Sequence, residues 1–134
     1  MLTATQSVQS AKTAIWSGRI VSALAILFLA FDGGIKALNL APAVDSTVQL
    51  GYPAGLVIGI GLLELACLAV YCIPRAAVLG AILLTGYLGG AIATQLRAGA
   101  PLFSIVFPII VGALIWGGLF AREPRLRALV PLRR

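Results

Sequence analysis

Two stretches of the chain carry no charged residue over a length that can cross a lipid bilayer: residues 76–96 and 98–121. The hydrocarbon core is about 30 Å thick and an α-helix rises about 1.5 Å per residue, so roughly 20 apolar residues span it. A third stretch, residues 52–73, is also long enough and contains one charged residue, Glu64. The sequence therefore predicts at least three membrane-spanning helices.

The composition excludes a soluble globular domain. Of the 134 residues, 60% are hydrophobic and 10% are charged, and the mean hydropathy is +1.05. Soluble domains have about 45–50% apolar and about 25% charged residues, and a chain of this length cannot bury so much apolar surface. The net charge of +6 therefore indicates contact with anionic lipid headgroups, and we expect no nucleic-acid partner.

A shorter apolar run, residues 20–31, spans the bilayer only if its helix continues past two charged residues to about residue 40. A secretory signal peptide is the alternative, with Lys12 and Arg19 as its basic region. The residues that follow, 32–34, are Asp-Gly-Gly and do not form the small-residue cleavage site of such a peptide. We therefore expect a fourth spanning helix here.

These stretches predict an all-α membrane protein, a four-transmembrane-helix antiparallel bundle, with helices at about residues 19–40, 53–73, 76–97 and 101–121. Residues 1–18 then form a cytoplasmic or interfacial segment ahead of one domain, 19–134, which has a sizeable loop at 39–51 and a basic tail at 122–134. With both termini on one side, that side carries eight of the ten Lys and Arg residues. The positive-inside rule therefore predicts that both termini are cytoplasmic.

Five polar residues of the predicted helices lie at similar depths: Asp32, Lys36, Glu64, Thr85 and Tyr87. Counted from the cytoplasmic ends of the helices they lie about 14–18 Å deep, with Lys36 one turn beyond Asp32. Lipid offers no hydrogen bonds, so a polar side chain within the bilayer is either paired or functional. The sequence predicts a buried polar cluster that three helices build together.

Two interpretations of this cluster stay open. Asp32 and Lys36 are four residues apart, which favours a structural ion pair on one helix face. Glu64 then clamps the helices together through Tyr87, Thr85 or Lys36. Alternatively, Glu64 belongs to a proton, ion or ligand site, since a lone carboxylate at the bilayer centre costs about 2.5–3.5 kcal/mol.

Glycines at four-residue spacing predict close helix packing. They occur at Gly55 and Gly59 and again at Gly86 and Gly90, with Gly89 beside the second pair. We expect these faces to pack against another helix, either of the bundle or of a second subunit.

The chain has few groups for redox or metal chemistry. It has no histidine, and its two cysteines, Cys67 and Cys72, are five residues apart, beyond disulfide distance on a helix. We therefore expect no bound metal, no cofactor and no catalytic residue.

Four segments resemble the DoxX-like membrane family. They are residues 28–36 (FLAFDGGIK), 59–64 (GIGLLE), 73–97 (IPRAAVLGAILLTGYLGGAIATQLR) and 119–132 (LFAREPRLRALVPL). The resemblance covers about residues 20–133 and implies a small bacterial inner-membrane protein with four transmembrane helices. It also implies recurring family positions, which are Glu64, Gly86, Tyr87, Gly89, Gly90, Thr94 and Arg97.

The chain departs from this family at one place. Relatives often have a histidine close before the arginine, where this chain has Gln95. Glutamine does not titrate near neutral pH and is not a usual metal ligand, so a mechanism that needs that histidine is not open to this chain.

Three functions follow from these features. The first is a non-catalytic accessory or structural subunit of a larger membrane redox or energy-converting complex, packed in the bilayer against other subunits or a second copy. The second is a membrane redox component that binds a quinone or a lipid, with Tyr87, Glu64, Thr94, Gln95 and Arg97 as headgroup contacts; the family's link to a quinone-dependent oxidoreductase implies it. The third is a small transporter or proton pathway centred on Asp32, Glu64 and Tyr87.

Overall fold

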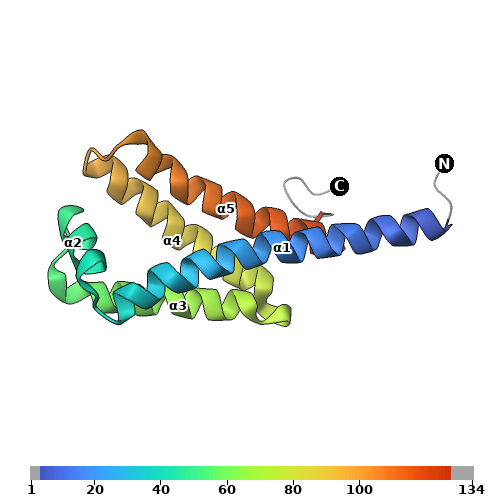
Figure 1. The fold of residues 1–134 in the computed structure, drawn as a ribbon, viewed down its shortest axis with the longest axis horizontal. Helices are drawn as coiled ribbons and strands as arrows, with labels where there is room; N and C mark the ends of the chain where they lie inside the picture. The colour runs from blue at the N-terminus through green and yellow to red at the C-terminus, as the bar shows by residue number, and fades with distance from the viewer. Residues whose placement is uncertain (1–3, 128–134) are drawn as a thin grey trace.

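The computed structural model describes residues 4–127 and shows an all-helical fold (Figure 1). The helices are α1 (Ala4–Ala37), α2 (Ala41–Gln49), α3 (Val57–Cys72), α4 (Ala77–Arg97), α5 (Leu102–Arg122) and α6 (Pro124–Arg127). Short 3₁₀ turns, Ala54–Leu56 and Pro74–Ala76, lead into α3 and α4. Residues 128–134 of the predicted basic tail, and residues 1–3, lie outside the described part.

Four of these helices are long and apolar enough to cross a membrane, as the sequence predicts. Each packs against two others, in the order α1, α3, α4, α5 and back to α1. Successive spans run antiparallel, and the beginning of α1 lies at the same end of the bundle as the end of α5 (Figure 1). The pair α1/α3 and the pair α4/α5 diverge toward the opposite end, where α2 lies.

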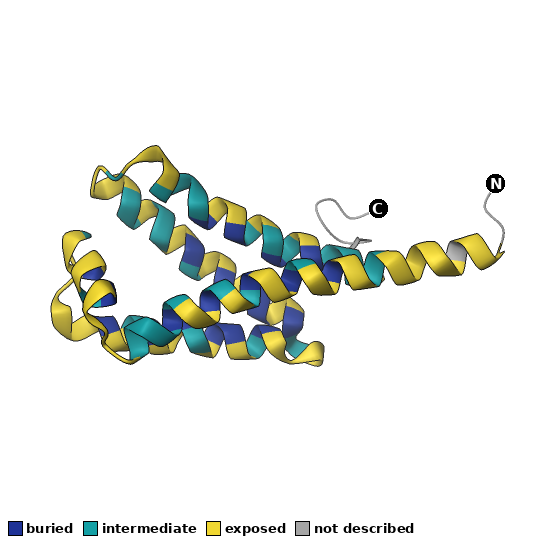
Figure 2. Ribbon diagram, in the orientation of Figure 1, coloured by how far each residue is buried: buried dark blue, intermediate teal, exposed yellow. Residues whose placement is uncertain are grey.

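The core lies along the facing sides of the four helices (Figure 2). Its largest fully buried members include Tyr71, Leu29, Leu84, Ile115 and Leu119. Many large hydrophobic side chains point outward instead, among them Leu27, Phe31 and Leu63. In a soluble protein such a surface would be unstable in water, and here it fits contact with lipid.

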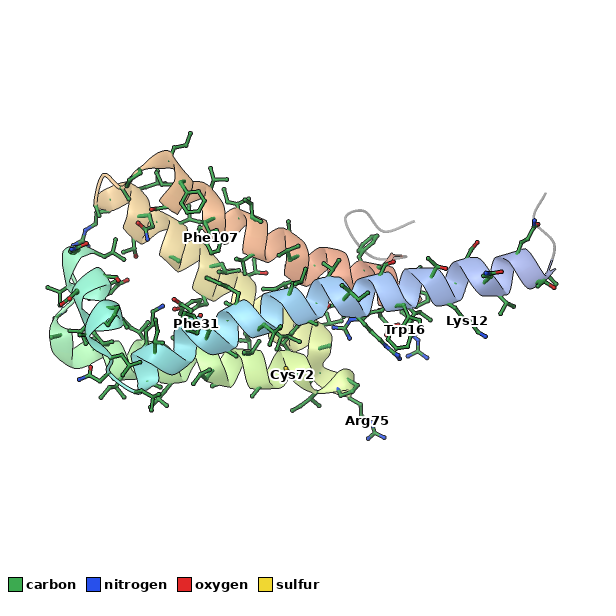
Figure 3. The ribbon with its side chains drawn as sticks, viewed as in Figure 1. Lys12, Trp16, Phe31, Cys72, Arg75 and Phe107 are labelled. Carbon is green, nitrogen blue, oxygen red and sulfur yellow. The ribbon has the colours of Figure 1, made fainter. Side chains whose placement is uncertain are left out.

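Helix α1 is longer than predicted. The sequence analysis places its start near residue 19, whereas the helix begins at Ala4 and its first part extends beyond the bundle, where Lys12 lies (Figures 1 and 3). Residues 4–17 contain neither glycine nor proline, so nothing in the backbone ends the helix. Residues 4–18 are therefore helical and continuous with the first span, and the cytoplasmic or interfacial place predicted for residues 1–18 stays a prediction.

The predicted loop at residues 39–51 contains a helix, α2. Pro42 lies in its first turn, where a missing N–H costs nothing. The hydroxyls of Ser46 and Thr47 donate to the carbonyls of Pro42 and Ala43 one turn earlier, at 2.5 and 2.7 Å. The Pro, Asp and Ser of this segment predict a loop, but Pro is also tolerated in a first helical turn and a Ser hydroxyl can bond the carbonyl one turn earlier.

The turn between α1 and α2 fixes where α1 ends. Asn39 adopts a positive φ of 57°, and the N–H groups of Asn39 and Leu40 donate to the carbonyls of Lys36 and Ile35 at 3.0 Å each. This is a left-handed cap that satisfies the last carbonyls of the helix. It stops α1 one residue after Lys36, so that Lys36 lies at the end of the helix.

Candidate functional site

Four of the five predicted polar residues meet between α1, α3 and α4. Asp32 and Lys36 lie one turn apart on the last part of α1, Glu64 lies halfway along α3, and Tyr87 lies halfway along α4. Lys36 lies one residue before the end of α1 and contacts the middle of the two neighbouring helices. We call these four residues the polar cluster.

The lysine ammonium is the centre of the polar cluster. Lys36 Nζ donates to Asp32 Oδ2 at 2.6 Å, to Tyr87 Oη at 3.0 Å and to Glu64 Oε2 at 3.3 Å. Tyr87 in turn donates its hydroxyl hydrogen to Glu64 Oε2 at 2.9 Å. The ammonium also lies 5.7 Å from the centre of the Tyr87 ring, within the range of a cation–π interaction.

The members of the polar cluster differ in burial. The Glu64 side chain is fully buried, whereas those of Lys36 and Asp32 are 17% and 29% exposed. Glu64 Oε1 is buried and has no hydrogen-bond partner among the described residues. A buried acceptor without a donor costs about 1–3 kcal/mol, so this oxygen is the least satisfied atom of the cluster.

A cavity of about 520 Å³ adjoins the polar cluster. Residues from α1, α2, α3, α4 and α5 line it, including all four members of the cluster. An aromatic wall faces them, where Phe28 and Phe107 meet edge to face at 4.8 Å and Phe103 lies 5.6 Å from Phe107 (Figure 3 labels Phe107). The cavity is thus mostly apolar, with one strongly polar wall.

Further polar residues line the cavity toward the end where α4 finishes. Thr94 and Gln95 are lining residues, and the Thr94 hydroxyl is 2.9 Å from that of Tyr52, which precedes α3. Arg97, by contrast, is exposed and does not line the cavity. Of the three predicted headgroup contacts, the structure brings Thr94 and Gln95 to the cavity and leaves Arg97 outside it.

Thr85 does not join the polar cluster. It is exposed, and its hydroxyl donates to the carbonyl of Ala81 at 2.7 Å and accepts from Trp116 Nε1 at 2.7 Å. Thr85 and Tyr87 are two residues apart and so about 200° apart around α4. The prediction matched their depth but not their helix face.

The five glycines predicted to pack have open space beside them. A Cβ on Gly55, Gly59, Gly86, Gly89 or Gly90 would meet nothing within 4 Å. Within this chain these glycines therefore make no close helix contact, and Gly86 and Gly90 line the cavity. The alternative, that they pack against a second subunit, stays a prediction.

Other glycines make the close helix contacts. At each of five glycines, an added Cβ would come too close to atoms of a neighbouring helix. They are Gly18 and Gly118 between α1 and α5, Gly33 and Gly61 between α1 and α3, and Gly80 between α4 and α3. Their spacing in the sequence matches no four-residue repeat, so only the helix crossings reveal them.

A second buried polar contact was not predicted. The Tyr71 hydroxyl donates to the carbonyl of Ile115 at 3.0 Å and lies 2.9 Å from the Ser22 hydroxyl. The guanidinium of Arg122 stands 5.5 Å from the Tyr71 ring. These groups join α1, α3 and α5 at the end of the bundle away from the cavity, and their hydrogen bonds stabilise that end of the bundle. A tyrosine near the end of an apolar run was the only sequence signal.

The described residues offer few groups of the kind that bind metals or form disulfides. Within residues 4–127 no group of three or more His, Cys, Asp or Glu side chains could hold a metal ion. Cys67 is buried and Cys72 is exposed, and both are free. What the arrangement offers is a small apolar cavity with a charged, hydrogen-bonded wall.

Fold and site together define a small multi-pass helical membrane protein with a cavity between its helices. The chain belongs to the DoxX-like family, which matches residues 20–118. That match contains the whole polar cluster. Comparison with curated proteins and with solved structures gives no match.

Proposed function

We propose that this chain is a multi-pass protein of the bacterial inner membrane that binds a small amphipathic molecule in the cavity beside the polar cluster. The observation that carries the proposal is the cavity itself, whose polar wall comes from three helices. Small-molecule pockets are typically about 300–1,000 Å³, mostly apolar, with a few placed polar groups. A volume of about 520 Å³ lies within that range.

A molecule with one ring and an alkyl chain fits this wall arrangement. Its ring would lie against Phe28 and Phe107, and its polar end would meet the exposed edge of Asp32 and Lys36. Quinones and their reduced forms have this shape, and the family resemblance favours them. The bound molecule would not need to be chemically changed by the protein.

We further propose that the chain acts as a non-catalytic partner of a larger membrane redox assembly, or of a second copy. The support is that Gly55, in the 3₁₀ turn before α3, and Gly59, on α3, are exposed and have open space beside them, where a helix of another subunit could approach closely. Purification in a mild detergent, followed by identification of co-eluting proteins, tests this part. Elution of the chain alone at its monomer mass would contradict it.

A matched pair of glycine substitutions tests ligand binding. Gly90 lines the cavity and Gly89 does not, and both have open space beside them. Gly90→Leu should fill the cavity, whereas Gly89→Leu adds the same side chain outside the cavity lining. Both variants keep the helix, since leucine is a better helix former than glycine.

Mass spectrometry of small molecules retained by the purified protein is the readout. We expect a retained amphipathic molecule in the unchanged protein and in Gly89→Leu, and its loss in Gly90→Leu. Equal retention in the two variants would refute binding in the cavity. Binding of a decyl-chain benzoquinone or hydroquinone, measured by calorimetry in micelles, is the second readout.

A small transporter or proton pathway is the second candidate. The unpartnered Glu64 Oε1 favours it, because buried carboxylates in membranes often carry protons. Protection of Glu64 by a bound substrate against a carbodiimide would support transport, while proton uptake into vesicles that is unchanged in Glu64→Gln would refute it.

The proposed orientation places both termini in the cytoplasm. Single cysteines introduced into the two terminal segments of a variant lacking Cys67 and Cys72 test it with a membrane-impermeant maleimide. Labelling of either terminus from the periplasmic side of intact cells would refute the orientation.

A further inference from the structure

The polar cluster has already used its hydrogen-bond donors. A lysine ammonium has three N–H groups and no acceptor, and those of Lys36 have Asp32 Oδ2, Tyr87 Oη and Glu64 Oε2 as acceptors. The one hydroxyl hydrogen of Tyr87 goes to Glu64 Oε2. Neither an N–H group of Lys36 nor the O–H of Tyr87 is therefore free for a ligand.

The same cluster has acceptors to spare. Glu64 Oε1 is buried without a partner. Asp32 is the most exposed of the three charged members, and Lys36 donates only to its Oδ2, so Asp32 is the acceptor that a ligand in the cavity reaches most readily. A carboxylate oxygen accepts more than one hydrogen bond, so a molecule at this wall meets acceptors rather than donors.

The formal charge points the same way. Two carboxylates and one ammonium carry a net charge of −1, and no other charged residue lines the cavity in the described part of the chain. The hydroxyls of Ser46, Thr47 and Thr94, which also line it, donate to carbonyls of their own helices. Tyr52 and Ser104 carry further hydroxyls on the lining, and both lie outside the polar cluster. Gln95 carries a further donor, but it lies two helical turns from Tyr87.

We infer that the end of the ligand that meets the polar cluster is a hydrogen-bond donor, a hydroxyl or an ammonium group, and not a bare carbonyl. The inference rests on the proposed binding function and specifies its ligand class. Applied to a quinone-type ring, it predicts that the protein binds the reduced, hydroxyl-bearing form in preference to the oxidised form.

Two matched pairs of probes test the inference by calorimetry on the full chain in detergent micelles, under anaerobic conditions. Decyl hydroquinone and decyl benzoquinone have the same ring substitution and the same alkyl chain, but the first carries O–H donors where the second carries C=O acceptors. Decylamine and decyltrimethylammonium share a positive charge and differ in the N–H groups. We expect the donor-bearing member of at least one pair to bind at least ten times more tightly than its partner.

The two pairs also separate the two sources of a donor. Tighter binding of the hydroquinone than of the benzoquinone would identify the ligand's donor as a hydroxyl. Tighter binding of decylamine than of decyltrimethylammonium would identify it as an ammonium group. Equal affinities within both pairs, or tighter binding of the benzoquinone, would overturn the inference while leaving the binding function intact. If none of the four probes binds, the proposed function itself fails for this class of ligand.

Variants locate the effect in the polar cluster. Asp32→Asn supplies an amide donor in place of a carboxylate, so the preference for donor-bearing probes should fall to less than threefold. Glu64→Gln should reduce it in the same way and keeps the test open if Asp32→Asn does not fold. Asp45→Asn is the matched control, since Asp45 is exposed on α2 and does not line the cavity. An unchanged preference in both cluster variants would overturn the assignment to this wall.

Discussion

Replacement of Gly61 by alanine should force α1 away from α3 and weaken the polar cluster. A Cβ at Gly61 would lie 2.5 Å from the backbone nitrogen of Ala37 and 2.6 Å from the Cβ of Lys36. Non-bonded carbon atoms settle at about 3.5–4.0 Å, so the two helices must separate by roughly 1 Å at this crossing. The contact between Lys36 Nζ and Glu64 Oε2 is already 3.3 Å, and the same displacement takes it out of hydrogen-bonding range.

The net loss of stability follows from two opposing terms. Overpacking costs about 1–3 kcal/mol, whereas alanine favours a helix over glycine by about 1 kcal/mol. These terms combine to a loss of about 0–2 kcal/mol in the free energy of unfolding for Gly61→Ala, and to a loss of about 1–3 kcal/mol relative to a Gly→Ala change that meets no neighbour. Gly61→Ala should also lower the preference for donor-bearing probes, because an N–H of Lys36 that now goes to Glu64 becomes free for a ligand.

Unfolding by sodium dodecyl sulfate in mixed micelles, followed by far-UV circular dichroism, measures the effect. Gly59→Ala is the matched control, since it lies on the same helix and its Cβ would meet nothing within 4 Å. That variant should be as stable as the unchanged protein, or slightly more stable. Equal unfolding midpoints for Gly61→Ala and Gly59→Ala would refute the argument that α1 and α3 are in contact at Gly61.

Three further substitutions address the ion pairs, the second polar contact and the end of α1. Lys36→Met leaves two carboxylates without their ammonium and should lower the free energy of unfolding by about 3–5 kcal/mol. A loss below about 1 kcal/mol in detergent unfolding would show that the Lys36 charge does not hold Asp32 in place. Tyr71→Phe removes the hydrogen bonds of the hydroxyl, including that to Ser22, and should cost about 1 kcal/mol with binding unchanged, because membrane hydrogen bonds average about 0.6 kcal/mol each. Asn39→Val places a β-branched residue at positive φ and should cost about 1–2 kcal/mol, whereas Asn39→Gly should not; equal midpoints for the two variants would contradict this cap.

The membrane class and the four spans could be predicted because they depend on local composition. Residues 76–96 and 98–121 are too long and too apolar for any other use, and the observed spans begin and end within a few residues of those predicted, apart from the start of α1. The helix α2 was missed because Pro, Asp and Ser favour both loops and first helical turns. Whether these residues form a loop or a helix depends on the course of the backbone after Asn39.

The polar cluster was partly predictable for a similar reason. The depth of a residue along a helix can be counted from the sequence, and by depth Asp32, Lys36, Glu64 and Tyr87 were predicted to lie together. It also included Thr85, because depth does not say which face of α4 turns toward α3. The free acceptor of Glu64 could not be predicted at all, since it depends on which oxygen Lys36 and Tyr87 approach.

By itself, the sequence determined that the chain lies in a membrane, how many times it can cross, and which polar residues share a level. Each of these is a property of single segments in contact with lipid. The tertiary structure alone decided that Gly61 and Gly80, and not Gly59 and Gly86, lie at the helix crossings, and that the four helices leave a cavity beside the charged residues. Those features depend on the rotation and tilt of each helix against two neighbours, and that geometry is fixed by the packing of all four together.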